Sequence, residues 1–366
     1  MALVFGLFAC AGESVGPVFD APGTDAGLER PVDRDAGSTP SDGSADAGAV
    51  ATTDAGTAID AGTSANTCDP FSLRVPEPQA FIAPTGLQNL LLSHINAATT
   101  SLSLMMYQLT LDAFTNAFIA AHRRGVSVRV MLDMSQAANN RARDALQAAG
   151  VPWKAAPTEF EHNHAKVLII DRREAIVMSA NLIGFSMGSE RNYGVINTNA
   201  DDIVDLEAIF DRDWTGSGAL DLSCTRLVVS PVNARDRLLN FFNGATQTLD
   251  IAVMYLSDRD FVAVVKARKA AGVSVRVLLA DPDWIGGNRA TATDLGALGI
   301  PVKFLKTVEL HAKLVIADGV PFVGSQNYSW TSITKNREIG LFVTEATPRA
   351  AITAQFEADW RAGVTP

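Results

Sequence analysis

The amino-acid sequence predicts an α/β fold in which two duplicated lobes, each with a mostly parallel sheet, pack about a pseudo-two-fold axis. The clearest sign is an internal repeat, because GVSVRVML at 125–132 returns as GVSVRVLL at 272–279. The shorter repeats are Met-Tyr at 106–107 and 254–255, and Asp-Trp at 213–214 and 359–360. In both copies, short apolar runs alternate with amphipathic helical segments, which is typical of βαβ units and parallel sheets.

The elements come in the same order in each copy. In the first copy they are a helix over 88–99, a strand over 102–107, a helix over 112–124 and a strand over 126–132. In the second copy they are a helix over 234–244, a strand over 249–255, a helix over 260–271 and a strand over 273–279. We therefore expect a lobe at 68–216 and a second at 217–366, joined near 216–226. Any residue duplicated at equivalent positions then reaches the axis twice.

Charge is unevenly distributed along the 366 residues, whose net charge is −10. Residues 11–67 hold ten acidic and two basic side chains and repeat Asp-Ala-Gly five times. Residues 11–67 have too little apolar surface to offset the loss of conformational entropy on folding. We therefore expect this segment to be a disordered acidic linker. The chain from Cys68 onward is nearly neutral, and it therefore lacks the strongly basic character of a non-specific nucleic-acid clamp.

The N-terminal residues 1–10, MALVFGLFAC, resemble a bacterial signal segment that ends in a lipobox, with Cys10 as the lipidated residue. We therefore expect an exported lipoprotein of the cell envelope, periplasmic or extracellular. The alternative is an ordinary N-terminus with a chance cysteine. An oxidising compartment would permit a disulfide between Cys68 and Cys224, and two unpaired thiols are the alternative.

Other classes of protein are excluded by simple counts. No apolar run reaches the roughly 18 residues that a membrane-spanning helix needs. The three cysteines are too few for a disulfide scaffold or a four-cysteine zinc site.

The strongest motif is present twice. HAKVLIID at 164–171 is followed by SAN at 179–181, and HAKLVIAD at 311–318 is followed by SQN at 325–327. On a strand, the histidine and the lysine two residues later point to the same face. The candidate catalytic residues are His164, Lys166, Asp171, His311, Lys313 and Asp318, and the candidate phosphate-binding residues are Ser179, Asn181, Ser325 and Asn327.

Two imidazoles across an axis suit the cleavage of a phosphodiester. One neutral ring attacks phosphorus while the other, protonated, gives its proton to the leaving oxygen. Lysines and asparagine amides supply positive charge and hydrogen-bond donors to the phosphoryl oxygens. Asp171 and Asp318 either orient a ring or a lysine, or cap a turn.

These residues resemble the signature of the phospholipase D superfamily, H-x-K-x4-D-x6-G-S-x-N, over essentially the whole folded region. The resemblance implies a phosphohistidine intermediate, no metal and no cofactor. It also implies that His164 is the nucleophile and that His311 is the general acid and then the base. Two departures stand out. Met178 replaces the signature glycine, which we expect to narrow the approach to the phosphate, and Asn192 stands where the second copy has Glu338.

Several rival interpretations use the same region. His162-Asn-His164 is similar to a metal-dependent nuclease motif or part of a zinc site, but an apolar strand follows it and no ligand triad is evident. Gly184-Phe-Ser186-Met-Gly188 fits the serine-hydrolase pattern G-x-S-x-G, for which chance is the better explanation. Trp284 follows a predicted strand and either lies at the mouth of the site or only packs its loop.

The expected function is a phospholipase D-type phosphodiesterase that hydrolyses a phospholipid, with a phospholipid or a membrane surface as partner. The alternatives are a metal-independent endonuclease, a phosphatidyl transferase of the cardiolipin synthase kind, and a non-catalytic binding protein. A sparse basic strip of Arg141, Arg143 and Arg289 would favour nucleic acid. We expect a monomer.

Overall fold

The computed structural model describes residues 68–366, which fall within one compact unit. The expected signal segment with Cys10 and the expected linker at 11–67 lie outside the described residues.

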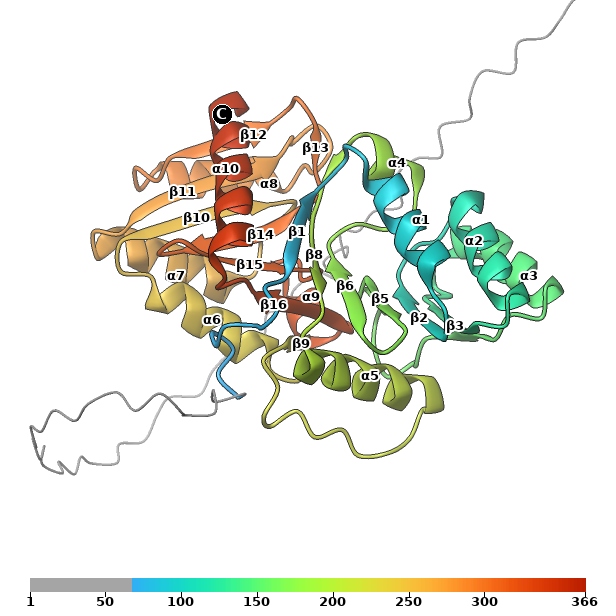
Figure 1. Cartoon of the computed structure of the whole chain (residues 1–366). Coiled ribbons are helices and arrows are strands. Elements are labelled where there is room, and N and C mark those ends of the chain that lie inside the picture. Colours follow the sequence, from blue (N-terminus) through green and yellow to red (C-terminus); the bar gives the residue numbers. More distant parts are fainter. Residues whose placement is uncertain (1–67) are drawn as a thin grey trace, which may run out of the picture. The chain divides into compact units, whose positions relative to one another are not determined.

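Two seven-stranded sheets dominate the described part of the chain (Figure 1). In spatial order, the first sheet contains β1 (Gln79–Ile82), β8 (Tyr193–Asn197), β6 (Glu174–Met178), β5 (Val167–Ile170), β2 (Ser101–Met106), β3 (Ser127–Leu132) and β4 (Trp153–Ala155). The second contains β12 (Val302–Leu305), β11 (Ser274–Ala280), β10 (Thr248–Val253), β14 (Lys313–Ala317), β15 (Val320–Gly324), β16 (Glu338–Phe342) and β9 (Val228–Ser230). A two-stranded ribbon of β7 (Glu190–Arg191) and β13 (Glu309–Leu310) joins the two halves.

The strand directions confirm the expected α/β class. In each sheet the pairings make five of the seven described strands run the same way, as expected for a mostly parallel sheet. The motif strands β5 and β14 run the other way, because each is joined to its successor by a tight turn that only antiparallel strands can use.

Helices cover both sheets. Those of the first half are α1 (Leu87–Ala97), α2 (Asp112–Arg123), the short 3₁₀ helix η1 (Ala137–Asn139), α3 (Asn140–Ala148), α4 (Gly184–Gly188) and α5 (Ala200–Thr215). Those of the second half are α6 (Ala234–Gly244), α7 (Arg259–Ala270), α8 (Asn288–Gly296), α9 (Trp330–Thr334) and α10 (Ala346–Ala362). Helices α1, α2 and α3 pack on the outer face of the first sheet and α6, α7 and α8 on that of the second, whereas α5 and α10 pack into the central core between the sheets. The asparagine side chain of Asn199 accepts the backbone N–H groups of Asp201 and Asp202 and so starts α5, and Gly216 ends that helix at φ 69°.

Alternate residues of the strands enter different cores. In β5, Leu168 and Ile170 pack with α1, α2 and α3, whereas Val167 and Ile169 enter a central core that is shared with the second sheet. In β14, Leu314 enters the same central core. The motif strands therefore lie against the interface between the two halves.

Ion pairs cross this interface in a symmetric way. Arg191 of the first half bonds Asp359 of the second (2.8 Å), and Arg337 of the second half bonds Asp213 of the first (2.7 Å). Each half thus gives an arginine and receives one, as a pseudo-two-fold axis requires. This exchange explains why the Asp-Trp dipeptide is duplicated in the sequence.

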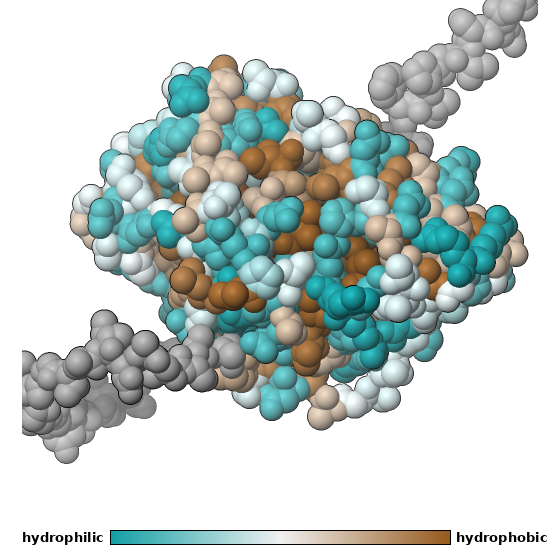
Figure 2. Space-filling model, viewed as in Figure 1, coloured by the Kyte–Doolittle hydropathy of each residue, from teal (hydrophilic) through white to brown (hydrophobic). Residues whose placement is uncertain are grey.

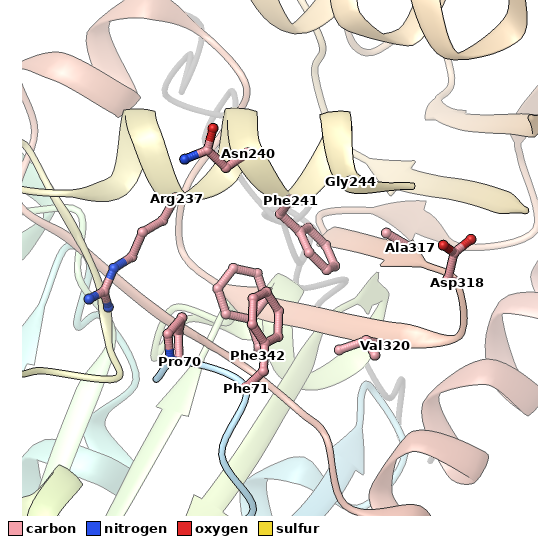
Figure 3. A pocket seen from close by; sticks show the side chains of 10 residues that line it. All are labelled: Pro70, Phe71, Arg237, Asn240, Phe241, Gly244, Ala317, Asp318, Val320 and Phe342. Atoms are coloured by element: carbon pink, nitrogen blue, oxygen red, sulfur yellow. The ribbon is translucent and has the colours of Figure 1, made fainter. Parts of the chain in front are cut away.

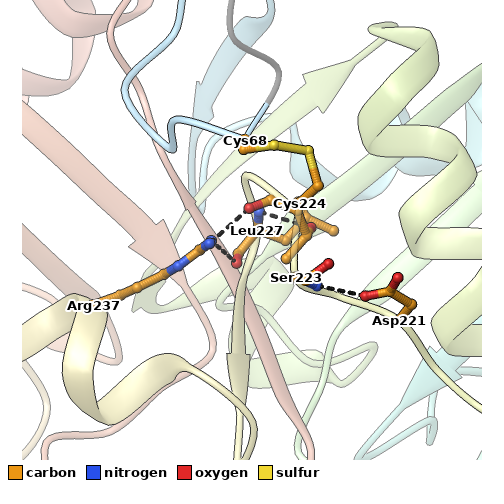
Figure 4. Close-up of a disulfide and its surroundings, with 7 residues drawn as sticks. Cys68, Asp221, Ser223, Cys224, Leu227 and Arg237 are labelled. Atoms are coloured by element: carbon orange, nitrogen blue, oxygen red, sulfur yellow. Dashed lines mark hydrogen bonds between the residues drawn. A yellow bond between two sulfur atoms is a disulfide. The ribbon is translucent and has the colours of Figure 1, made fainter.

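A disulfide joins Cys68 and Cys224 (Figure 4). It ties the first described residues to the connector between the sheets, beside Arg237, which donates to the carbonyls of Leu227 (2.6 Å) and Thr225 (2.7 Å). Of the two alternatives for these cysteines, the structure therefore shows the bridge.

The visible surface mixes hydrophilic and hydrophobic residues, with hydrophobic residues gathered near the middle of the face, where β1 and β8 lie in Figure 1 (Figure 2). Between residues 68 and 366, no helix has the length and apolar character needed to cross a membrane.

Candidate active site

The first histidine of the repeated motif, His164, lies three residues before the start of β5 and is almost completely buried, with 1% of its surface exposed. The His164 Nδ1 atom lies 2.7 Å from the Glu338 carboxylate, and its backbone N–H donates to the Arg337 carbonyl (2.9 Å). Both partners belong to the second half. The interface between the halves therefore holds this ring in place.

Glu338 is a fully buried carboxylate that the fold keeps charged. It also accepts hydrogen bonds from the Ser332 hydroxyl and from the Asn336 amide (3.1 Å). Burial alone would raise the pKa of Glu338, but His164, Lys166 and the Ser332 hydroxyl together hold that pKa below its ordinary value. A charged carboxylate can only accept, so His164 carries its proton on Nδ1, and Nε2 is then the basic atom of the neutral ring.

The second histidine occupies the equivalent position across the pseudo-two-fold axis, but its ring has a different partner. His311 is 3% exposed, its Nδ1 lies 2.9 Å from the Asn192 Oδ1 atom, and its backbone N–H donates to the Arg191 carbonyl (3.1 Å). The Glu190 carboxylate stands further back, 3.6 Å from Nδ1. Each histidine is therefore held by the opposite half of the chain.

The two lysines of the motif are as buried as the histidines. Lys166 Nζ donates to the His164 carbonyl (2.8 Å) and lies 5.0 Å from the centre of the Tyr107 ring. Lys313 Nζ donates to the His311 carbonyl (2.8 Å). The positive charge of each lysine therefore lies next to the histidine two residues before it, where it could stabilise the negative charge of a phosphoryl group.

The serines of the motif differ from expectation. The Ser179 hydroxyl donates to Asn192 Oδ1 (2.8 Å), and the oxygens of Ser179 and Ser325 accept the backbone N–H groups of Tyr193 and Ile339 (both 3.1 Å). These hydroxyls therefore brace the following strands, and a direct role of the two serines in phosphate binding stays a prediction.

The asparagines of the motif remain candidates for binding phosphate. Asn181 and Asn327 are buried, and their side-chain oxygens have no hydrogen-bond partner among the described residues. An unpartnered amide oxygen needs a donor such as water, so binding of a phosphoryl oxygen would fall to the Nδ2 group of each side chain.

Met178 does not narrow the approach to the phosphate. Its side chain lies in the core under α1, α2 and α3, on the opposite face of β6 from Val177, which enters the central core. The equivalent Gly324 has no such room, because an added Cβ would lie 2.7 Å from the Gly340 backbone. The expectation from the sequence was therefore wrong.

Of the two roles considered for Asp171, the structure shows the turn cap and not the placement beside a catalytic ring or lysine. The four-residue strand β5 separates Lys166 from Asp171, a span of about 16 Å at about 3.3 Å per residue. The Asp171 carboxylate accepts the backbone N–H groups of Thr99 (2.9 Å), Thr100 (2.7 Å) and Ser101 (2.9 Å). It ties the turn after β5 to the start of β2.

Asp318 does the same in the second half. Its carboxylate accepts the backbone N–H groups of Thr246, Gln247 and Thr248 (each 2.8 Å). It borders an apolar pocket of about 450 Å³ at the turn end of β14, where Phe71, Phe241 and Phe342 gather (Figure 3). Asp171 and Asp318 therefore cap turns at the end of the strand away from the histidines.

The pattern G-x-S-x-G acquires a structural explanation. Ser186 is fully buried and donates to Glu190 (2.6 Å), as Ser332 does to Glu338 in the other half. Ser186 is therefore a brace for the carboxylate behind His311.

Two side chains near the histidines, Trp284 and His162, occupy different positions in the two copies of the repeat. The Trp284 ring lies 6.5 Å from the His311 ring and packs against the central core. The His162 ring lies 5.6 Å from the Tyr107 ring, and its Nδ1 lies 3.6 Å from the buried carboxylate of Asp133.

The predicted basic strip is neutralised in the structure. Arg141 pairs with Asp112, Arg143 with Asp144, and Arg289 with Asp283. Within residues 68–366, no group of three or more His, Cys, Asp or Glu side chains is arranged to hold a metal ion.

Sequence reasoning singled out Asn192 and Glu338 as a difference between the copies but missed that they orient the two rings. The signal was present, because Glu190-Arg191-Asn192 and Asn336-Arg337-Glu338 are the same three residues in opposite order. Only the contacts show that the third position of each tripeptide touches a histidine.

Comparisons with known proteins agree with this architecture. The family described as "Cardiolipin synthase, PLD-like domain" matches residues 91–214 and 238–360, which together make up more than half of the chain. The chain is 25% identical over 323 residues to phospholipase D Z of Dictyostelium discoideum, covering 69% of this chain and 76% of that protein. It is 24% identical over 285 residues to a cardiolipin synthase of Clostridium perfringens strain SM101, covering 65% of this chain and 60% of that protein.

A solved structure supports the fold. The phosphatidylserine synthase of Haemophilus influenzae superposes with a TM-score of 0.64 at 12% identity, covering 79% of this chain and 87% of that chain.

Proposed function

Because the chain belongs to the phospholipase D superfamily, through the family of PLD-like domains of cardiolipin synthase, we propose that it is a phosphodiesterase that cleaves the head-group bond of a phospholipid. The observation that carries the proposal is the pair of buried histidines whose Nδ1 atoms are both occupied by partners from the opposite half. Both rings therefore offer Nε2 for chemistry. Its relatives named as phospholipase D and cardiolipin synthase favour a phospholipid as substrate.

In the proposed reaction, Nε2 of His164 attacks the phosphorus and a phosphorus–nitrogen bond forms. The bond from phosphorus to the head-group oxygen breaks, and the protonated His311 gives its proton to that oxygen. Glu338 supports the positive charge that develops on the His164 ring, and the lysines neutralise the phosphoryl oxygens. Water then attacks the phosphorus, its proton passes to His311, and the phosphorus–nitrogen bond breaks to release phosphatidate.

A phosphatidyl transferase is the second candidate, because the matching family is described as cardiolipin synthase. It shares every step up to the phosphohistidine. An alcohol such as the glycerol head group of a second lipid then takes the place of water, and the product is a new phosphodiester.

The test uses the full chain with EDTA, offered vesicles of phosphatidylcholine and phosphatidylglycerol, and plasmid DNA in parallel. Release of phosphatidate supports hydrolysis, formation of cardiolipin from phosphatidylglycerol supports transfer, and nicking of DNA without lipid turnover supports a nuclease. We expect lipid turnover that resists EDTA and disappears in His164→Ala. Lipid turnover that EDTA abolishes would contradict a reaction carried by the histidines alone.

The intermediate can be caught directly. In His311→Ala, the phosphohistidine forms with an activated ester such as a 4-nitrophenyl phosphodiester but resolves slowly, because no base prepares the water. Mass spectrometry after acid-free digestion should then find the added group on the peptide that contains His164. Modification of a different peptide would refute the assignment of the nucleophile.

We also propose that the protein is exported, because the Cys68–Cys224 disulfide suits an oxidising compartment. Anchoring through Cys10 is part of the same proposal. Cell fractionation with metabolic palmitate labelling tests it, with Cys10→Ser as the control. Unlabelled protein in the cytosol would contradict both parts.

A further inference from the structure

The two histidines occupy positions related by the pseudo-two-fold axis, but the side chains that contact their rings differ in charge. The first half has Glu190-Arg191-Asn192 and the second has Asn336-Arg337-Glu338, so acid and amide have exchanged places around a shared arginine. The arginines make equivalent ion pairs across the interface, which shows that the two tripeptides occupy equivalent positions.

The contacts around Asn192 fix which way its amide faces. Glu190 accepts a hydrogen bond from the Asn192 Nδ2 group (3.1 Å) and another from Ser186 (2.6 Å). A carboxylate offers only acceptors, so the NH₂ group of Asn192 must face it and Oδ1 must face away. Oδ1 then accepts from Ser179 (2.8 Å) and meets Nδ1 of His311 (2.9 Å).

This orientation determines the tautomer of His311. Because the amide oxygen is an acceptor, Nδ1 must carry a hydrogen, and Nε2 is left as the atom that gains and loses a proton. Glu190 never needs to touch the ring in order to do this.

We infer that Asn192 and Glu190 form a positioning pair for His311 that holds its Nδ1–H tautomer and makes it a weaker base than His164. The reason is the distance from each ring to the carboxylate that faces it from the opposite half of the described chain, 2.7 Å from Nδ1 of His164 to Glu338 and 3.6 Å from Nδ1 of His311 to Glu190. A charge in direct contact stabilises an imidazolium more than a charge behind a neutral amide. Asn192, Glu190, Ser186 and Ser179 are all buried, so water does little to equalise the two sites.

The other groups around the two rings are closely matched. A lysine bonds the carbonyl of each histidine, Lys166 on one side and Lys313 on the other. The neutral rings of Tyr107 and Trp284 lie 4.8 Å from His164 and 6.5 Å from His311. The Glu309 side chain, two residues before His311 along the chain, accepts a hydrogen bond from the Ser189 hydroxyl (3.1 Å). The exchange of acid and amide is thus one difference in charge between the two sites. A second is the buried Asp133, whose carboxylate accepts the N–H of Asn163 beside His164 (2.7 Å) and lies 3.6 Å from Nδ1 of His162.

The inference rests on the proposed function for its consequence. If His311 is the general acid, a weaker base is a stronger proton donor, and this helps a poor leaving group such as a head-group alkoxide to depart. A good leaving group such as 4-nitrophenolate needs no such help.

The direct test is an NMR titration of the full chain labelled with isotope-enriched histidine. The chain contains five histidines. The signals of the two rings are assigned as those missing in His164→Ala and His311→Ala. We expect both neutral rings to show the Nδ1–H tautomer, and the pKa of His311 to lie below that of His164 by about one unit.

Two variants should move His311 in opposite directions. Asn192→Asp brings a carboxylate into contact and should raise the pKa of His311 by about one unit, whereas Glu190→Gln should lower it and loosen its tautomer. Asn336→Asp is the matched control, since it adds a carboxylate beside Glu338 and should leave the titration of His311 unchanged. Should Asn192→Asp fail to fold, Glu190→Gln alone still decides the sign.

Equal titration of the two rings, an Nε2–H tautomer at His311, or a titration that ignores both variants would overturn the inference. Kinetics then separate it from the proposed function. Asn192→Asp, which makes His311 a weaker proton donor, should slow turnover of phosphatidylcholine by up to about tenfold, and by more than it slows turnover of bis(4-nitrophenyl) phosphate. If the wild type turns over no phosphodiester while the titrations behave as expected, the proposed function fails and the inference stands.

Discussion

Asp171 and Asp318 belong to the repeated motif, yet the structure uses them to fasten turns. They adopt φ values of 52° and 47°, in the left-handed region that aspartate tolerates better than most residues. Their carboxylates each collect three consecutive backbone N–H groups from the start of a neighbouring strand. At the scale of single residues, the motif therefore combines chemistry at one end of a strand with a structural clamp at the other.

Replacing Asp171 should therefore affect stability more than chemistry. Asp171→Ala removes the acceptor for three backbone N–H groups and should lower the free energy of unfolding by about 1–2 kcal/mol, a figure reduced for the partial exposure of the site. Urea unfolding measures this, and kcat per folded molecule should stay within about twofold of wild type. A loss of kcat comparable to that of His164→Ala would restore the catalytic assignment.

The same carboxylates should make the fold sensitive to acid. Burial alone would raise the pKa of Asp318, but the backbone N–H groups of Thr246–Thr248 hold that pKa at about 2. Burial would likewise raise the pKa of Asp171, but the backbone N–H groups of Thr99–Ser101 hold it well below its ordinary value. A pKa lowered in the folded state adds stability above the unfolded value of about 3.9 and loses it as pH falls.

Urea unfolding at a series of pH values should thus show the free energy of unfolding falling from about pH 4 to about pH 2. In an Asp171→Asn, Asp318→Asn double variant, this part of the fall should be smaller. An identical acid profile in wild type and double variant would contradict it.

At the scale of elements, one buried asparagine in each half joins the ends of two neighbouring central strands. The buried Asn139, at the end of η1, donates to the carbonyls of Tyr107 and Asp133 (both 2.8 Å) and accepts the N–H of Leu109 (2.8 Å). It therefore joins the ends of β2 and β3. In the second half, Asn288 donates to the carbonyls of Met254 (2.9 Å) and Ala280 (3.0 Å) in the same way.

Asn139→Leu should be strongly destabilising, because it leaves two carbonyls and one N–H buried without partners. We expect the free energy of unfolding to fall by about 2–4 kcal/mol. Thermal and urea unfolding check this, with the exposed Asn140→Leu as the neighbouring control. A change in Asn139→Leu no larger than in the control would show that the two strand ends do not depend on this side chain.

At the scale of the two halves, each half of the described chain completes the candidate active site of the other. The backbone N–H of His164 bonds Arg337, whose guanidinium in turn bonds Asp213 (2.7 and 2.9 Å) back in the first half. His311 bonds Arg191, which reaches Asp359 of the second half in the same way. The arrangement of the two sheets and the geometry of the site are thus one structure.

Breaking one of these pairs should cost more than a surface ion pair. Asp213→Ala leaves the buried Arg337 uncompensated and should lower the free energy of unfolding by about 3–5 kcal/mol. Asp359→Ala should cost less, because the Arg191 side chain is 15% exposed, against 3% for Arg337. Urea unfolding of both variants measures the difference, and equal losses would contradict the argument from burial.

The sequence by itself determined the duplication, the α/β class, the order of the helices and strands, and the residues of the two motifs. It could do so because these features depend on local periodicity and on residues close together along the chain. Helix α6 spans 234–244 in the structure as in the prediction. The Asp-Gly turn at 318–319 also carried the signal for a hairpin, although the prediction did not use it.

Only the tertiary structure decided which residues touch the histidines. Glu338 is 174 residues from His164, and Asn192 is 119 residues from His311. No local pattern reports a contact at such a separation, since it exists only once two sheets have packed across a shared core. The same packing directs Met178 into a core, moves Asp171 and Asp318 away from the chemistry, and makes two equivalent histidines unequal.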